Sequence, residues 1–402
     1  MLSVTDSPRW KLCVLFFITA AAMGMWSVPF GNVLRAHGLE SIIGYAYACS
    51  AVAAFISPLT IGAMADQRVS PVRLLRWLSV GSACCLTIGF YGIQRGWGAW
   101  AVLGAMQAQA ICAAPSFGLA TSIILASLGD AQREFGPIRA VATLGWMLAC
   151  AAVSYILRAD TSTLTGFAAA GVWLLTAAFT FALPETPPPV SNEPRDLFGL
   201  SALSLLKHKD HRVVFLTAAL YNAAMAAFYP FTPIHLLERG VTHATAAMAL
   251  GQISELTCML SLARLFSRVR LKTVFLTGIG FTVVRYALCA FDTKAWLIAG
   301  VTLHGFGFTL YFITAQIYLE QRVDPRMRTR AQALLQVMIA GFGNLAGYLG
   351  TGWWRSACMS DGVTNWSRFW WGMSALAAGV FVFFALSYRG QARRNDTGRV
   401  NA

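Results

Sequence analysis

Charged residues are scarce in this chain. Only 12% of its 402 residues are Asp, Glu, Lys or Arg, whereas soluble globular domains contain about 25%. Hydrophobic residues make up 57% of the chain, and its mean hydropathy is +0.58. So little charge cannot cover the surface of a soluble protein of this length. The composition therefore excludes a soluble enzyme, a soluble nucleic-acid-binding protein and a disordered chain.

Clusters of catalytic or metal-binding residues are also missing. The nine Cys form no CxxC pair and no Cys/His cluster, and eight of them fall inside apolar segments. Zinc sites and disulfide frameworks require regular Cys or His spacings. Paired acids and His-rich boxes of the kind that a membrane enzyme needs are absent as well. We therefore expect no metal, no cofactor and no enzymatic activity.

Long apolar runs recur along the whole chain. Each is long enough to cross a bilayer core of about 30 Å as a helix. A β-barrel is excluded, because its strands would be segments of about 10 residues with alternating polarity. One run, 97–127, is too long for a single straight span, and Pro115 predicts a break in it. The twelve predicted spans are 12–34, 42–64, 74–93, 97–127, 138–157, 164–183, 213–237, 244–266, 273–291, 296–320, 331–354 and 368–388.

The longest polar stretch divides the spans into six and six. We predict an N-terminal six-helix bundle over 1–183, a cytoplasmic linker over 184–212, a C-terminal six-helix bundle over 213–390 and a basic cytoplasmic tail over 391–402. The predicted fold is therefore an all-α membrane protein of two six-helix bundles. In such folds the solute site lies between the bundles, near the middle of the membrane.

The basic residues indicate the orientation. The formal net charge is +14, which in a soluble protein would suggest nucleic acid. If the N-terminus is cytoplasmic, 21 of the 31 Lys and Arg fall in cytoplasmic segments and seven in outer loops. Because positive charges are retained on the cytoplasmic side, this asymmetry predicts cytoplasmic N- and C-termini and explains the net charge without nucleic acid.

One acidic residue lies deep inside a predicted span. Glu255 is about 10 residues from either end of span 244–266, so roughly 15 Å from each membrane face. A carboxylate at that depth is costly unless it is protonated or paired. We predict that Glu255 binds and releases a proton; a structural ion pair is the alternative. Gln252 lies on the same helical face, where it either faces the solute or joins two helices.

Three other predicted spans carry further candidate residues. Arg139, Thr143 and Trp146 share one helical face in the fifth span, although Arg139 could instead reach the cytoplasmic surface. In the ninth span, Arg285 either reaches outward or pairs with Glu255. His304 shares a face with Phe308 in the tenth span, and Thr309 is adjacent. His304 is a second candidate for the proton, with a packing role as the alternative.

A cytoplasmic loop carries a charged cluster. Asp66 lies at the end of the second span, and Arg68 and Arg73 follow it. An acid at a helix end with several Arg nearby can form charge-assisted hydrogen bonds. We predict that this loop is an inner gate.

With twelve spans, this topology and the loop that contains Gly62 and Asp66, the chain resembles the major facilitator superfamily. More specifically, it is similar to the bacterial nucleoside:proton symporters through GPIRAVATLGW, QISE, VRYALCAF, DPRMRTRAQALLQVMIAGFGNLAGYLGTG and DGVTNW. By that resemblance, substrate-pocket positions fall on Arg139, Thr143, Gln252, Glu255 and Phe308. Trp146, His304 and Thr309 stand where the family has Phe, Tyr and Asp, and a Gln/Asn pair of span seven is replaced within NAAMAAFYPFTPIH.

The sequence therefore predicts a proton-coupled symporter of a small polar organic solute, above all a nucleoside, working by alternating access. The resemblance implies the bacterial inner membrane, and we expect a monomer whose partners are the solute, protons and the lipid bilayer. Another solute, such as a sugar or an aromatic acid, or export, is the alternative within transporters. A polytopic membrane enzyme or sensor is the alternative from a different class.

Overall fold

The computed structural model describes residues 8–57, 69–185, 200–266 and 269–390. Among these residues, 11 helical segments are long and apolar enough to cross a membrane. The predicted span 244–266 forms two shorter helices, which are separated at Ala249. The all-helical membrane fold is thus confirmed, and the count of twelve spans stays a prediction. Many large apolar side chains are exposed on the helices, among them Trp100 (83%) and Leu260 (80%), as is expected of surfaces that face lipid.

By their contacts, the helices form two compact units. The first unit comprises residues 1–194 and 228–249, and the second comprises 195–227 and 250–402. This division assigns one hairpin of the C-terminal half, residues 228–249, to the first unit.

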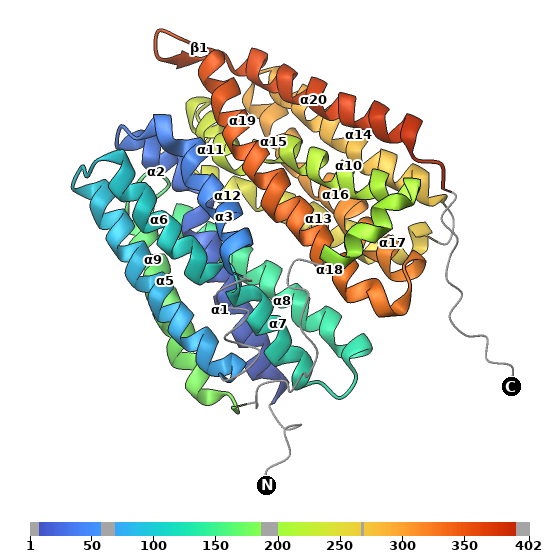
Figure 1. Ribbon diagram of the computed structural model, residues 1–402. Helices are drawn as coiled ribbons and strands as arrows, with labels where there is room; N and C mark the ends of the chain where they lie inside the picture. Colours follow the sequence, from blue (N-terminus) through green and yellow to red (C-terminus); the bar gives the residue numbers. More distant parts are fainter. Residues whose placement is uncertain (1–7, 58–68, 186–199, 267–268, 391–402) are drawn as a thin grey trace, which may run out of the picture. The chain divides into compact units, whose positions relative to one another are not determined.

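Within its described residues, the first unit contains ten α-helices and three short helical segments, many of them labelled in Figure 1. They are α1 (Arg9–Ser27), α2 (Phe30–Ala36), η1 (Glu40–Ile42), α3 (Ile43–Ser57), α5 (Pro71–Gln94), α6 (Ala99–Ala113), α7 (Ser116–Ala126), α8 (Ala131–Ala151), the π-helix η3 (Ala152–Ile156), α9 (Leu164–Phe179), η4 (Thr180–Ala182), α11 (Phe228–Glu238) and α12 (Ala244–Met248). The break predicted at Pro115 is confirmed, since Pro115 separates α6 from α7.

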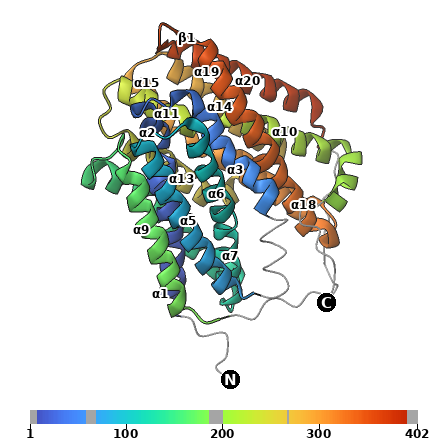
Figure 2. The ribbon, with the colours of Figure 1, turned by 60° about the vertical axis from the view of Figure 1, so that its left-hand side comes forward.

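Glycine allows the helices of the first unit to approach closely. Helix α1 packs against α8 and α9, and α5 packs against α6 and α9. Figure 2 shows α5 beside α6 and α9. A Cβ atom on Gly145 of α8 would overlap the carbonyl oxygen of Phe17 in α1. One on Gly166 of α9 would overlap the ring of Phe90 in α5. Small residues at such crossings are typical of helices that associate within a membrane.

The second unit contains the remaining elements. They are the 3-10 helix η5 (Leu200–Lys207), α10 (Lys209–Met225), α13 (Leu250–Phe266), α14 (Leu271–Ala290), α15 (Lys294–Thr302), α16 (His304–Phe308), the π-helix η6 (Thr309–Ile313), α17 (Thr314–Arg322), η7 (Pro325–Met327), α18 (Arg328–Gln336), the π-helix η8 (Val337–Gly343), α19 (Asn344–Ala357), strands β1 (Met359–Ser360) and β2 (Val363–Thr364), which pair antiparallel, and α20 (Trp366–Ser387).

An aromatic cluster forms the core of the second unit. The ring of Phe275 in α14 lies 5.2 Å from that of Tyr311 and 5.1 Å from that of Phe384 in α20. Helix α14 packs along α20, as Figure 1 shows, and also contacts α16 and η6. The core thereby places the tenth predicted span, formed by α15, α16, η6 and α17, against α14.

Candidate functional site

One face of α8 carries the predicted solute residues of the first unit. Arg139, Thr143 and Trp146 are all half-buried. The guanidinium carbon of Arg139 lies 4.8 Å from the ring centre of Phe117, a cation–π contact. The ring of Trp146 packs against Gly24 of α1 and meets the ring of Tyr229 edge-on at 6.1 Å. The structure thus brings a cation, a hydroxyl and aromatic rings together along this helix.

Two glycines bring the predicted acid and histidine of the second unit close together. A Cβ atom on Gly305 of α16 would overlap the backbone of Glu255 in α13, and one on Gly251 would lie 3.1 Å from the Cβ of His304. The backbone N–H of Gly305 donates to Ser254 Oγ at 3.0 Å. Helices α13 and α16 therefore cross in backbone contact, with Glu255 half-buried at the crossing.

A buried arginine meets the histidine from the other side. Arg285 of α14 is 0% exposed, so it does not reach outward to the surface. Its guanidinium donates to Nδ1 of His304 and, at 2.7 Å, to the hydroxyl of Tyr286. The sulfur of Met225 lies 3.2 Å from the same guanidinium. Because arginine only donates, Nδ1 of His304 accepts, and the ring proton of neutral His304 resides on Nε2.

A tyrosine that the sequence did not single out extends this polar group. The hydroxyl of Tyr221 in α10 lies 2.5 Å from Thr282 Oγ1 and donates to the carbonyl of Gly278 at 3.2 Å. A Cβ atom on Gly307 would lie 2.5 Å from the same Thr282 oxygen. No motif marks Tyr221; only a polar group in an otherwise apolar span could have indicated it.

Phe308 and Thr309, the two other candidate residues of the tenth predicted span, lie in different surroundings. The ring of Phe308 lies 6.3 Å from that of His304 and 5.2 Å from that of Phe312. Thr309 is fully buried at the first position of the π-helix η6, and its hydroxyl has no hydrogen-bond partner among the described residues. π-Helical turns often occur at functional sites.

Asn222 has a structural role in this arrangement. Its amide donates to Oδ1 of Asn344 at 2.6 Å and to the carbonyl of Ile339 at 2.9 Å. These bonds join α10 to η8 and the start of α19. Gln252 lies three residues before Glu255 on α13 and is 9% exposed.

The predicted inner gate is visible only in part. Asp66 and Arg68 lie outside the described residues. Arg73, at the start of α5, binds both carboxylate oxygens of Glu185, at 2.9 and 2.6 Å. This hydrogen bond from Arg73 is the main cause of a pKa of Glu185 below its usual range. The pair ties the start of α5 to the chain that follows α9.

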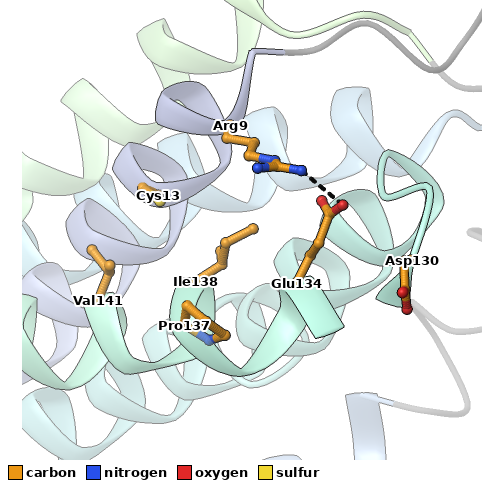
Figure 3. A pocket seen from close by; sticks show the side chains of 7 residues that line it. All are labelled: Arg9, Cys13, Asp130, Glu134, Pro137, Ile138 and Val141. Atoms are coloured by element: carbon orange, nitrogen blue, oxygen red, sulfur yellow. Dashed lines mark hydrogen bonds and ion pairs between the residues drawn. The ribbon is translucent and has the colours of Figure 1, made fainter. Parts of the chain in front are cut away.

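A cavity of about 680 Å³ opens between α1 and the start of α8 (Figure 3). An ion pair of 2.8 Å between Arg9 and Glu134 spans it, and Asp130, Cys13, Pro137, Ile138 and Val141 complete its lining. None of the predicted solute residues lines this cavity. It is a feature of the helix ends, and the sequence analysis did not predict it.

The described residues contain no group of three or more His, Cys, Asp or Glu that could hold a metal ion.

A family model, that of the nucleoside H+ symporters, matches residues 7–393. The chain belongs to the nucleoside H+ symporter family. The resemblance seen in the sequence is thereby confirmed.

Named relatives and a solved structure agree with this family. Over 400 residues the chain is 32% identical to YegT of Escherichia coli (strain K12), covering 94% of the chain and 93% of YegT. It is 26% identical over 404 residues to the xanthosine permease of the same organism, covering 94% and 96%. The crystal structure of the nucleoside transporter NupG superposes with a TM-score of 0.86 at 23% identity, covering 95% of this chain and 99% of NupG.

As a nucleoside H+ symporter, the chain is a polytopic membrane transporter of nucleosides and protons. In the first unit, the geometry joins Arg139, Thr143 and Trp146 on α8. In the second, it places Glu255, His304 and Arg285 on three helices in mutual contact.

Proposed function

We propose that this nucleoside H+ symporter imports a nucleoside with protons by alternating access, with Glu255 as the proton-binding residue. The observation that carries the function is the family match over residues 7–393. The proposal includes twelve spans in two six-helix bundles, cytoplasmic termini, a monomer and location in the bacterial inner membrane. The asymmetry of Lys and Arg supports this orientation.

The nucleoside is proposed to bind polar and aromatic side chains. On α8, Trp146 offers a surface for the base and Arg139 and Thr143 offer hydrogen-bond donors. In the second unit, the substrate-binding residues are Gln252, Glu255, His304, Phe308 and Thr309. The buried Thr309 hydroxyl, with no partner among the described residues, supports such a role, because an unsatisfied buried hydroxyl is costly unless a ligand completes it.

Glu255 is proposed to bind a proton when the solute site is open to the outside of the cell. Protonation removes the cost of holding a carboxylate within the membrane, and the nucleoside then binds beside it. Rearrangement of the bundles exposes the acid to the cytoplasm, where hydration favours its ionised form and releases the proton. His304 is the second candidate, but its Nδ1 accepts from the permanently charged Arg285. This arrangement disfavours a second proton on the ring, and we therefore prefer Glu255.

The inner gate is proposed to contain Asp66, Arg68 and Arg73. The ion pair of Arg73 with Glu185 supports a role for the start of α5 in joining cytoplasmic helix ends. When the solute site is open to the outside, these charged groups would hold the cytoplasmic side closed.

Uptake into proteoliposomes tests this function. The purified protein is reconstituted with an imposed pH gradient, acidic outside, and offered labelled xanthosine, uridine, adenosine, a sugar and an aromatic acid. We expect nucleosides to accumulate above equilibrium, and a protonophore to abolish the accumulation. Liposomes without protein and protein without a gradient are the controls.

Three outcomes would contradict the proposal. Accumulation of the sugar or the aromatic acid but of no nucleoside would favour the alternative solute. Nucleoside accumulation that is indifferent to the pH gradient would exclude proton coupling. Efflux without uptake would indicate an exporter.

A further inference from the structure

A hairpin in the C-terminal half of the sequence is bounded by two helix breaks. The helical run of α10 and α11 is interrupted by a turn at Ala226 and Ala227, and that of α12 and α13 by a turn at Ala249. The division into compact units falls at the same two places, so that residues 228–249 belong by contact to the first unit. The hairpin is therefore a separate packing element, joined to the second unit through two short turns.

A buried carboxylate holds the start of α12. Asp160, in the loop between η3 and α9, is 7% exposed. Its Oδ1 accepts hydrogen bonds from the backbone N–H of Thr245 at 2.7 Å and from Ser154 Oγ at 3.0 Å. Ser154 Oγ in turn accepts from the backbone N–H of Ala246 at 3.0 Å. Two N–H groups of the first turn of α12, which have no partner within the helix, are thus satisfied by another segment of the unit.

Three further contacts fix the hairpin on the first unit. The ring of His243 packs on that of Tyr155 in η3, with centres 4.4 Å apart. Arg35 of α2 forms an ion pair with Glu238 at the end of α11. A Cβ atom on Gly31 of α2 would overlap the carbonyl oxygen of Pro230 in α11, so only glycine permits this approach.

We infer that the hairpin 228–249 is the outer gate of this symporter and that Asp160 is its latch residue. The inference rests on the proposed function and on the predicted topology, in which η3, α2 and the hairpin are at the outer end. The hairpin is continuous in sequence with the helices that carry Tyr221 and Glu255. When the outer side opens, the hairpin leaves its place on α2 and η3, and the hydrogen bonds to Asp160 must break.

The charge of Asp160 matters for this latch. A carboxylate that accepts from backbone N–H groups forms charge-assisted hydrogen bonds, which are about twice as strong as neutral ones. Asn at this position keeps the size and one acceptor oxygen but loses the charge. The Asp160→Asn variant therefore shifts the population toward the open outer side without creating a large cavity.

Labelling of a hairpin cysteine measures this shift. Thr245 is 0% exposed, so a cysteine in Thr245→Cys is protected from a membrane-impermeant maleimide while the latch is closed. In Asp160→Asn, we expect the labelling rate of this cysteine in intact cells to rise roughly tenfold. Ser154→Ala, a milder change, should raise it by a smaller factor. Asp361→Asn, in the turn between β1 and β2, is the matched control and should leave it unchanged.

Cross-linking tests the gate in the opposite direction. Cysteines in the pair Tyr155→Cys and His243→Cys are bridged with a short, reducible bis-thiol reagent. We expect bridging to abolish nucleoside uptake and reduction to restore it, while the same reagent leaves each single variant active. Full uptake by the bridged protein would overturn the inference, as would an equal labelling rate in Asp160→Asn and its control. Labelling that occurs only after permeabilisation would place the hairpin on the cytoplasmic side and would also overturn the inference.

The labelling experiment needs neither a nucleoside nor a pH gradient. A latch that responds to Asp160→Asn in a protein that accumulates no nucleoside would refute the proposed function and leave the latch itself standing. Nucleoside accumulation with unchanged labelling would refute only the latch. If Asp160→Asn is not recovered from the membrane, Ser154→Ala and the cross-linked pair still decide the outcome.

Discussion

The two units place their charged groups differently. Both units have ion pairs at helix ends, among them Arg9 with Glu134 and Arg73 with Glu185 in the first and Arg328 with Glu320 in the second. In the second, Arg285 is fully buried in the body of α14 and donates to His304 and Tyr286. Charge at helix ends joins neighbouring elements, whereas charge within a span is costly and usually marks a functional pathway. On this ground we propose that the first unit contributes to gating and the second to proton chemistry.

The largest effect is expected from the buried arginine. Arg285→Ala leaves a cavity and removes the donor to His304 and Tyr286, so we expect a loss of about 3–5 kcal/mol in the free energy of unfolding. Arg95, exposed directly after the end of α5, donates to Tyr91 at 3.1 Å. Arg95→Ala is therefore a matched control that should cost well under about 1 kcal/mol. Thermal unfolding in detergent measures both. Equal stability of the two variants would remove the distinction between the units.

The glycine crossings should be sensitive in both units. Gly145→Ala forces a methyl group against the backbone of Phe17, and Gly305→Ala forces one against the backbone of Glu255. Each should cost about 1–3 kcal/mol, because backbone cannot yield as a flexible side chain does. Gly118→Ala, at a helical position with open space, is the control. At equal residual stability, Gly305→Ala should lose more proton-driven uptake than Gly145→Ala, because it displaces Glu255, the proposed proton-binding residue. Equal uptake by the two variants would argue against that role of Glu255.

Much of the fold could be predicted from the sequence, because the length of an apolar run indicates directly whether it can cross a membrane as a helix. The break at Pro115 was also predictable, since proline has no N–H to donate. The site was less predictable. Glu255 and His304 stand out as polar residues in apolar spans, but the glycines that bring their helices together, Gly251 and Gly305, look like many other glycines of the chain. Nor does a sequence show that Asp160 bonds to Thr245, 85 positions away.

The smallest effect is expected at the cytoplasmic pair of Arg73 and Glu185. Because the pKa of Glu185 is lowered in the folded protein, the pair stabilises it above the usual pKa of a glutamate, about 4.3, and this contribution disappears as the pH falls through the lowered pKa. Glu185→Gln should therefore reduce the unfolding temperature slightly at pH 7 and not at the acid end of the range. Both carboxylate and guanidinium are largely exposed. A difference in unfolding temperature between Glu185→Gln and the unchanged protein that grows toward low pH would contradict a stabilising ion pair between Arg73 and Glu185.

The central claim is that Glu255 couples proton and nucleoside movement. It is tested most directly by comparing accumulation and exchange in proteoliposomes that contain Glu255→Gln, because glutamine mimics the protonated acid. We predict that this variant still exchanges labelled for unlabelled nucleoside across the membrane but does not accumulate nucleoside in response to a pH gradient. Full proton-driven accumulation by Glu255→Gln would contradict the claim and move the search for the coupling residue to His304.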